Sequence, residues 1–108
     1  MNVFDQIAQT GVVPVVAIDD PERAVGLADA LAEGGLPIAE ITFRTSAARK
    51  AIANIVSARP EFLVGAGTVI TERQVQDTVQ AGGRFALAPG TDPAIITAAK
   101  GAGLPYAP

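Results

Sequence analysis

Apolar runs with the character of β-strands recur along this sequence, and a segment with helical punctuation follows each of the first four. The runs are VVPVVAI at 12–18, IAEITF at 38–43, FLVGAGTV at 62–69 and FALAP at 85–89, and a fifth begins in LPYAP at 104–108. They are almost continuously apolar rather than alternating, which is typical of parallel strands buried on both faces. The repetition therefore predicts an α/β fold built from successive strand–helix units.

Capping residues mark where the helices between these strands should begin and end. The expected starts are Asp20 with Pro21, then Thr45 or Ser46, then Thr71 with Gln74 as a capping box, and finally Asp92 with Pro93. The pair Gly34–Gly35 is expected to end the first of these helices. Each unit therefore runs from a strand through a short loop into a capped helix.

Two architectures accommodate such a repeat, an open doubly wound sheet and a closed (β/α)₈ barrel. Polar residues gather where the expected strands end, at Glu40, Thr42 and Arg44, at Thr68, and around Pro89. Both architectures place their sites at the carboxyl ends of the strands. The pattern thus predicts where a site lies without deciding between the two folds.

Length and composition reduce the number of possible folds, partners and functions. With 108 residues the chain is at most one domain, 1–108 with no internal linker, and it is short for a complete barrel. A net charge of −3 without a basic stripe argues against nucleic acid and anionic membranes as partners. The chain has no Cys and no His, so chemistry must come from other side chains. No apolar run approaches a membrane span, and the N-terminus lacks a signal peptide, so we expect a soluble, cytoplasmic protein.

Glu40 is the most informative single residue, because an acid in a buried strand must be paired or must hold a proton. On an extended strand it shares a face with Thr42 and Arg44. We expect its pKa to be raised and, in a barrel lumen, its carboxyl group to serve as a general acid or base. An ion pair with Arg44 that merely fills the lumen is the alternative. The planar fork of Arg44 suits the carboxylate of a small substrate, although a solvated arginine near a helix start fits equally.

The segment VGAGT ends its strand with a further polar residue, Thr68. It is similar to part of a dinucleotide fingerprint, but Ile70 occupies the place of the third glycine, which makes an open-sheet nucleotide binder a weaker alternative. We expect Gly65 and Gly67 to let neighbouring backbone or a ligand approach closely while Thr68 presents its hydroxyl group. A bulge or a pair of packing glycines remains open. Pro89 on its own reads as a strand terminator.

Together, VVPVVAI, AEITFRT, VGAGTV, FALAPG and LPYAP resemble, in this order, the N-terminal half of the 2-keto-3-deoxy-6-phosphogluconate (KDPG) and 4-hydroxy-2-oxoglutarate aldolases. The resemblance implies a (β/α)₈ barrel, of which this chain covers the first four strands and the start of the fifth. Such enzymes are typically trimers that cleave their substrate reversibly to pyruvate and an aldehyde such as glyceraldehyde 3-phosphate. A lysine forms a Schiff base with pyruvate, and no metal or other cofactor takes part.

The resemblance also assigns roles to individual residues. Glu40 matches the general acid/base, Arg44 the residue that holds the pyruvate carboxylate, Thr68 a hydroxyl that contacts pyruvate, and Pro89 a proline that lines the pocket. The Schiff-base lysine of the family belongs to a sixth strand, in a motif like F-K-F-F-P, and neither Lys50 nor Lys100 matches it.

Because no lysine of this sequence matches the Schiff-base lysine, the resemblance leads to expectations about activity and partners. We expect the chain alone to be inactive and to pair with a complementary C-terminal half or with a second copy of itself. A non-catalytic half-barrel or assembly module that retains an anion site is the alternative function. A metal-dependent aldolase is disfavoured, because without His all ligands would be oxygens and no acidic cluster is evident.

Overall fold

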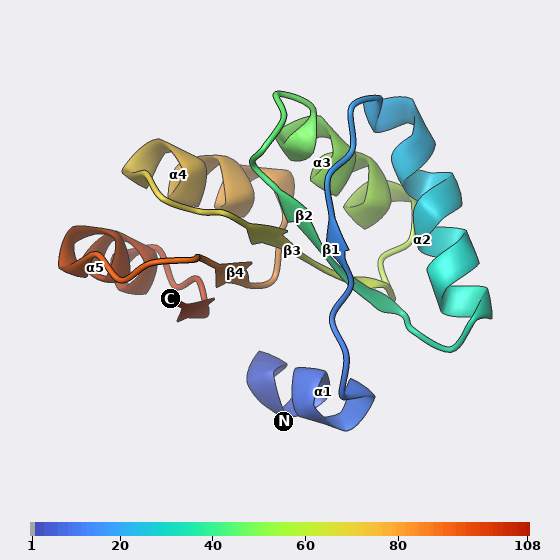
Figure 1. The fold of residues 1–108 in the computed structure, drawn as a ribbon, viewed down its shortest axis with the longest axis horizontal. Helices are drawn as coiled ribbons and strands as arrows, with labels where there is room; N and C mark the ends of the chain where they lie inside the picture. Colours follow the sequence, from blue (N-terminus) through green and yellow to red (C-terminus); the bar gives the residue numbers. More distant parts are fainter. Residues whose placement is uncertain (1) are drawn as a thin grey trace.

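The computed structural model describes residues 2–108, which form one parallel sheet flanked by helices (Figure 1). The strands are β1 (Val15–Val16), β2 (Ile38–Thr42), β3 (Leu63–Gly67), β4 (Ala86–Leu87) and β5 (Tyr106–Ala107). The helices are α1 (Val3–Thr10), α2 (Ala24–Glu33), α3 (Ala48–Ala58), α4 (Glu72–Ala81) and α5 (Pro93–Gly101), and the short 3₁₀ turn η1 (Pro21–Arg23) leads into α2. Among the described residues, none of the helices has the length and apolar character that a membrane span requires.

The order of the strands decides between the two predicted architectures. Every strand pairs in parallel with its successor, giving the order β1-β2-β3-β4-β5. A doubly wound sheet reverses direction and carries helices on both faces. Here α2, α3, α4 and α5 all contribute to one core on the same face of the sheet (Figure 1). This singly wound arrangement is that of a barrel wall, so the open doubly wound sheet is excluded.

Small side chains fill the space between that face and the helices. Four alanines at the helix contacts are almost fully buried, namely Ala24 and Ala28 of α2 and Ala48 and Ala51 of α3. Their lack of bulk lets the helices approach the sheet closely, and larger residues such as Ile52 and Ile55 then fill the gaps. The alanine-rich composition therefore reflects tight helix-on-sheet packing.

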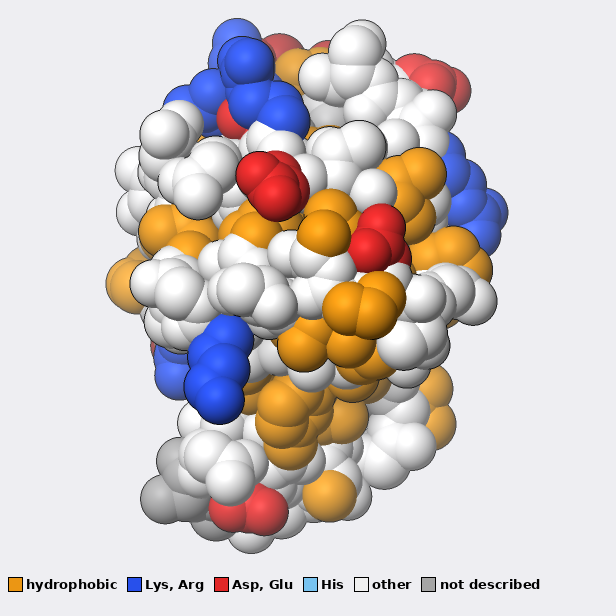
Figure 2. Space-filling view, turned by 90° about the vertical axis from the view of Figure 1, so that its left-hand side faces the viewer, with side chains coloured by type: hydrophobic (Ala, Val, Ile, Leu, Met, Phe, Trp, Pro, Cys, Tyr) orange, Lys and Arg blue, Asp and Glu red, His pale blue; other side chains and the backbone are white. Residues whose placement is uncertain are grey.

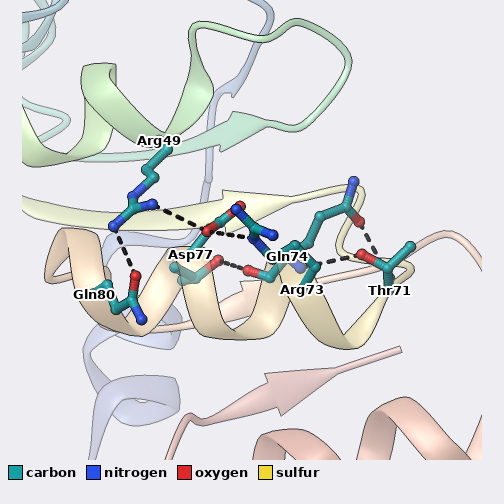
Figure 3. A network of polar contacts seen from close by, with 7 residues as sticks. Arg49, Thr71, Arg73, Gln74, Asp77 and Gln80 are labelled. Carbon is teal, nitrogen blue, oxygen red and sulfur yellow. Dashed lines mark hydrogen bonds and ion pairs between the residues drawn. The ribbon is translucent and has the colours of Figure 1, made fainter.

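Polar bridges fix neighbouring helices relative to each other. Arg49 on α3 donates to Asp77 at 3.3 Å and to Gln80 at 2.7 Å, both on α4 (Figure 3). Arg59, at the end of α3, forms a two-pronged pair with Asp29 of α2 at 2.6 and 2.9 Å. Solvent screens surface pairs of this kind, so they orient the helices more than they stabilise them.

Three of the expected helix starts are confirmed, and one is wrong in its detail. Asp20 caps η1, Thr71 and Gln74 form the capping box of α4, and Asp92 caps α5. Helix α3, however, begins at Ala48 without a side-chain cap. The Thr45 hydroxyl group instead donates to the Ile18 carbonyl at 2.5 Å and accepts from the Ala47 N–H at 3.3 Å, so it ties two loops together.

Helix α1 was not expected from the sequence. Asn2 and Asp5 form a capping box at its start, and Gly11, with φ of 83°, ends it in the left-handed conformation. Both signals are readable in the sequence, as Asn-x-x-Asp and as a glycine after the last helical residue. The helix lies on the opposite side of the sheet from α2–α5 (Figure 1).

The role of α1 is to close the amino-terminal end of the second sheet face. Val3 and Ile7 pack there against Ile38, Leu63 and Phe85, which form a separate small core. This face would be the lumen side of a barrel. The small core occupies the amino-terminal half of this face, whereas Glu40 and Thr42 lie toward the carboxyl ends of the strands.

The lateral edges of the sheet are open. Among residues 2–108, β1 pairs only with β2 and β5 only with β4. Val12 and Val15 on the β1 side are 56% and 59% exposed. Next to the β5 edge, the surface on the side of α4 and α5 carries hydrophobic side chains interspersed with a few acidic and basic ones (Figure 2). Unpaired strand edges beside apolar side chains favour association with further strands.

A polypeptide limited to these residues should therefore not be a stable monomer. We expect the 11.0 kDa chain to sediment as a dimer or larger species at tens of micromolar, because β1 and β5 then gain strand partners. Val15→Lys should shift it toward the monomer by placing a charge at the edge. A cooperative, well-folded monomer in sedimentation velocity would contradict the open-edge account.

Candidate functional site

Glu40 occupies the centre of the best-paired strand of the sheet. It lies opposite Val15 of β1 and Gly65 of β3, and its backbone N–H donates to the Pro14 carbonyl at 3.0 Å. Its neighbours Ala39 and Ile41 point into the helix-covered core, so Glu40 points to the lumen-side face. The residue is only 9% exposed. A central strand thus fixes the backbone of the acid on both sides.

Two glycines of β3 make room for side chains on that face. A Cβ atom at Gly67 would collide with Oε1 of Glu40 and would lie 2.9 Å from Cγ2 of Thr42. A Cβ atom at Gly65 would lie 2.5–2.6 Å from ring atoms of Phe85. The structure favours the alternative of packing glycines, because the groups that approach them are side chains rather than backbone or a ligand. The VGAGT segment is therefore a packing surface for Glu40 and Phe85, not a phosphate loop.

The electrostatic state of Glu40 follows from this enclosure. Burial raises its pKa above the ordinary value, and the positive charge of Arg44 lowers it by a smaller amount. Among residues 2–108, no hydrogen bond to its carboxylate is present, and the carboxylate oxygens keep some contact with solvent. A carboxyl group in such surroundings can hold a proton at a higher pH than usual and can transfer it. The predicted raised pKa of Glu40 agrees with this environment.

Arg44 lies in the turn after β2, and its side chain is exposed. Within the described chain it forms no ion pair with Glu40 or with any other carboxylate. The alternative in which a Glu40–Arg44 pair simply fills the lumen is therefore not what the structure contains. Arg44 lines an open hollow of ≈ 590 Å³ at the starts of α3 and α4, together with Thr45 and Thr71. Its guanidinium group is thus available to an anion.

Thr68 follows β3 in a strained conformation. Its φ of 55° makes it the one residue other than glycine with a positive φ among residues 2–108. For a β-branched residue this conformation costs on the order of 1–3 kcal/mol. The turn is held by two hydrogen bonds at Val69, whose N–H donates to the Leu87 carbonyl at 3.1 Å and whose carbonyl accepts from the Tyr106 hydroxyl at 3.1 Å. Sequence reasoning found Thr68 but not its strain.

Pro89 lies beyond β4, at the start of the loop to α5, and it is exposed. The structure thus places all four predicted site residues at or near the carboxyl ends of the strands. The carboxylate of Glu40 lies against Gly67, the residue that precedes Thr68 in the chain. The positive charge of Arg44 lies close enough to lower the pKa of Glu40. Pro89 follows β4, which is two places from β2 in the sheet.

Comparison with known proteins gives a consistent result. The family model described as KDPG and KHG aldolase matches residues 3–108. The chain is 39% identical over 107 residues to the 2-dehydro-3-deoxy-phosphogluconate aldolase of Haemophilus influenzae, covering 99% of this chain and 50% of the relative. It is 40% identical over 105 residues to the KHG/KDPG aldolase of Escherichia coli K12, covering 96% and 49%.

Solved structures of aldolases from this family have the same fold as this chain. The KDPG aldolase of Legionella pneumophila, with pyruvate captured as a covalent carbinolamine intermediate, superposes with a TM-score of 0.84 and 42% identity, covering 89% of this chain and 47% of that one. An aldolase of Zymomonas mobilis gives a TM-score of 0.88 at 31% identity, covering 98% and 51%. The chain spans about half the length of these relatives. Its fold is accordingly the first half of a (β/α)₈ barrel, with four strands and the start of a fifth.

The burial of Glu40 predicts a pH-dependent effect of removing its charge. Because its pKa is raised in the folded chain, the folded state binds the proton more tightly than the unfolded state, and the free energy of unfolding falls as pH rises through the two pKa values. Glu40→Gln should therefore stabilise the chain at pH 7, with the gain vanishing below about pH 4. Urea denaturation at fixed protein concentration measures both. The exposed Glu33→Gln serves as the control, and a loss of stability at pH 7 in Glu40→Gln would refute this account.

Proposed function

Because this chain belongs to the KDPG and KHG aldolase family, we propose that it forms the acid/base and pyruvate-binding half of a class I aldolase. The reaction is the reversible cleavage of 2-keto-3-deoxy-6-phosphogluconate to pyruvate and glyceraldehyde 3-phosphate. The observation that carries the proposal is the enclosed Glu40 carboxylate, which lies at the carboxyl end of the sheet on the lumen-side face.

Glu40 is the proton-transfer group in this proposal. Formation and breakdown of a carbinolamine require protons to move onto and off oxygen and nitrogen, and cleavage of the carbon–carbon bond requires a base for the departing aldehyde's hydroxyl proton. A carboxyl group whose pKa is raised by burial suits both directions, because it is able to give and to take a proton closer to neutral pH. A bound water molecule would carry the proton to the reacting atoms.

Arg44, Thr68 and Pro89 form the pyruvate pocket in this proposal. Arg44 offers two parallel N–H donors to the substrate carboxylate from the turn after β2. The strained turn holds Thr68 in place for a hydrogen bond to pyruvate, which is the pre-organisation expected of a binding residue. Pro89 contributes an apolar wall at the end of β4.

We place the Schiff-base lysine outside these residues. A lysine attacks a carbonyl only when it is neutral, which requires burial or a neighbouring cation. Lys50 and Lys100 are exposed on α3 and α5, and Lys50 lies 3.4 Å from Glu22 in an ion pair, so neither lysine is buried. The lysine, and closure of the barrel, would come from a complementary C-terminal half. The assembled enzyme would be a cytoplasmic homo-oligomer such as a trimer.

A second candidate is a non-catalytic half-barrel that keeps an anion site. It is favoured by the exposure of both lysines, together with the fact that Arg44 pairs with no carboxylate of the described chain. In that case the chain binds a small carboxylate or phosphate but does not turn it over, even when the rest of a barrel is supplied.

Complementation separates the two functions. The chain is mixed with a polypeptide that carries the remaining strands and helices of a relative such as the Escherichia coli enzyme. We expect the mixture to release pyruvate from 2-keto-3-deoxy-6-phosphogluconate. Borohydride should then trap pyruvate on the complementing polypeptide, as read from intact mass. Glu40→Gln should lower the rate by about 10²–10⁴-fold, the usual contribution of a general acid or base.

Three other outcomes of the complementation experiment would contradict parts of this proposal. A pyruvate adduct on this chain would return the nucleophile to Lys50 or Lys100. Unchanged turnover by Glu40→Gln would remove Glu40 from the mechanism. Binding without turnover in a mixture that forms the complex would favour the non-catalytic module.

The role of Arg44 is tested separately in the same mixture. Arg44→Lys keeps the charge but loses the paired donors, so pyruvate should bind about tenfold or more weakly. The pyruvate concentration that gives half-maximal borohydride trapping measures this. Arg23→Lys, at the exposed turn η1, is the matched control and should bind as the unmodified chain does. Equal affinity of Arg44→Lys and the control would disprove the carboxylate clamp.

A further inference from the structure

The position of Gly67 is defined by the side chains that fill the space above it. A Cβ atom there would overlap Oε1 of Glu40, would lie 3.1 Å from its Cδ, and would lie 2.9 Å from Cγ2 of Thr42. The space that a side chain of β3 would occupy is thus taken by two residues of β2. One of them is the candidate acid/base.

Of these two neighbours, Thr42 is the less able to move. It lies directly opposite Gly67 in the β2–β3 pairing and is 1% exposed. Its hydroxyl group donates to the Val16 carbonyl at 3.0 Å, which fixes the side chain and directs its methyl group toward β3. The carboxylate of Glu40 is the far end of a flexible side chain, so it is the group that any added atom at position 67 would displace.

We propose that Gly67 is a positioning residue for Glu40, because its missing side chain leaves the enclosed space on β3 in which the carboxylate lies. The catalytic consequence rests on the proposed function, but the positioning itself does not. Gly65 differs from Gly67 in its role although it has the same spacing on the strand. Its open space is taken by the fully buried ring of Phe85, which belongs to the small core above α1.

The surroundings determine what displacement would do. The groups that face Glu40 from adjacent strands are Val15 of β1 and Gly65 and Gly67 of β3, none of which titrates. Within residues 2–108, Arg44 is the one charged group that acts on its pKa. Burial raises that pKa, so a carboxylate pushed off β3 toward water loses this effect. Its pKa should then fall toward the ordinary value.

The experiment is a pH titration of the side-chain carboxyl carbon of Glu40 in the ¹³C-labelled chain, with the signal assigned by its loss in Glu40→Gln. Gly67→Ala should lower the pKa of Glu40 relative to the unmodified chain. Gly65→Ala should lower stability through Phe85 without the same shift. Gly26→Ala in α2, where a Cβ atom would meet nothing within 4 Å, should leave the pKa of Glu40 unchanged. An unchanged or higher pKa of Glu40 in Gly67→Ala would overturn the proposal.

A second variant allows for the case in which Gly67→Ala does not fold. Thr42→Ser keeps the hydroxyl donor to Val16 and removes the methyl group, so in the double variant Thr42→Ser/Gly67→Ala only the carboxylate must give way. That variant should fold and show the lowered pKa. Failure of both variants to fold would also overturn the proposal, because the flexible end of Glu40 should yield.

Activity in the complemented enzyme distinguishes this inference from the proposed function. If Glu40 transfers protons, Gly67→Ala should shift the pH–rate profile in the same direction as the carboxyl titration. If the titration shifts while Glu40→Gln retains full turnover, the positioning by Gly67 stands and the acid/base role fails.

Discussion

The pairing of β2 with β3 is the constraint on which the remaining structure depends. These two strands share five register pairs, from Ile38 opposite Leu63 to Thr42 opposite Gly67, whereas every other pair of strands shares one or two. Because side chains alternate between faces, a slip of one residue would bring Glu40 into the helix-covered core and an alanine to the lumen side. The same register brings the two glycines opposite Glu40 and Thr42. Sheet geometry and site geometry are therefore fixed by the same hydrogen bonds.

The two faces of the sheet differ in the side chains that this register brings to them. On the helix side, alanines and branched residues give an uninterrupted apolar core. On the lumen side, the chain divides the face along its length, with Phe85 and α1 sealing the amino-terminal half and Glu40 and Thr42 lying above them. The apolar core and the acid thus occupy different parts of one face, and burial among the strands raises the pKa of Glu40.

Much of this could be predicted from local sequence patterns, and the rest depends on contacts between distant segments. Strand–helix order, three of the caps and the burial of Glu40 follow from periodicity and punctuation. Strand β1 is far shorter than its apolar run, since Pro14 has no N–H and an outer strand pairs on one side only. Helix α1 was missed although its caps are readable, because the surface it covers exists only in the folded sheet. The strain at Thr68 and the occupant of the space at Gly67 depend on register and rotamer, which no single-residue pattern encodes.

The separation between Glu40 and Arg44 shows how the arrangement serves the proposed reaction better than a closed ion pair would. A guanidinium group within 4 Å would hold the pKa of Glu40 down and would leave the carboxyl group ionised and unable to donate a proton. It would also consume the two donors that a substrate carboxylate needs. Because β2 ends at Thr42 and Arg44 follows in a turn, the arginine stays outside ion-pair distance while its charge still acts on Glu40. In the proposed enzyme, the carboxylate of pyruvate would occupy this gap and would neutralise Arg44, which removes the one influence that lowers the pKa of Glu40. Substrate binding would thereby raise the proton affinity of the acid just when a proton has to be transferred.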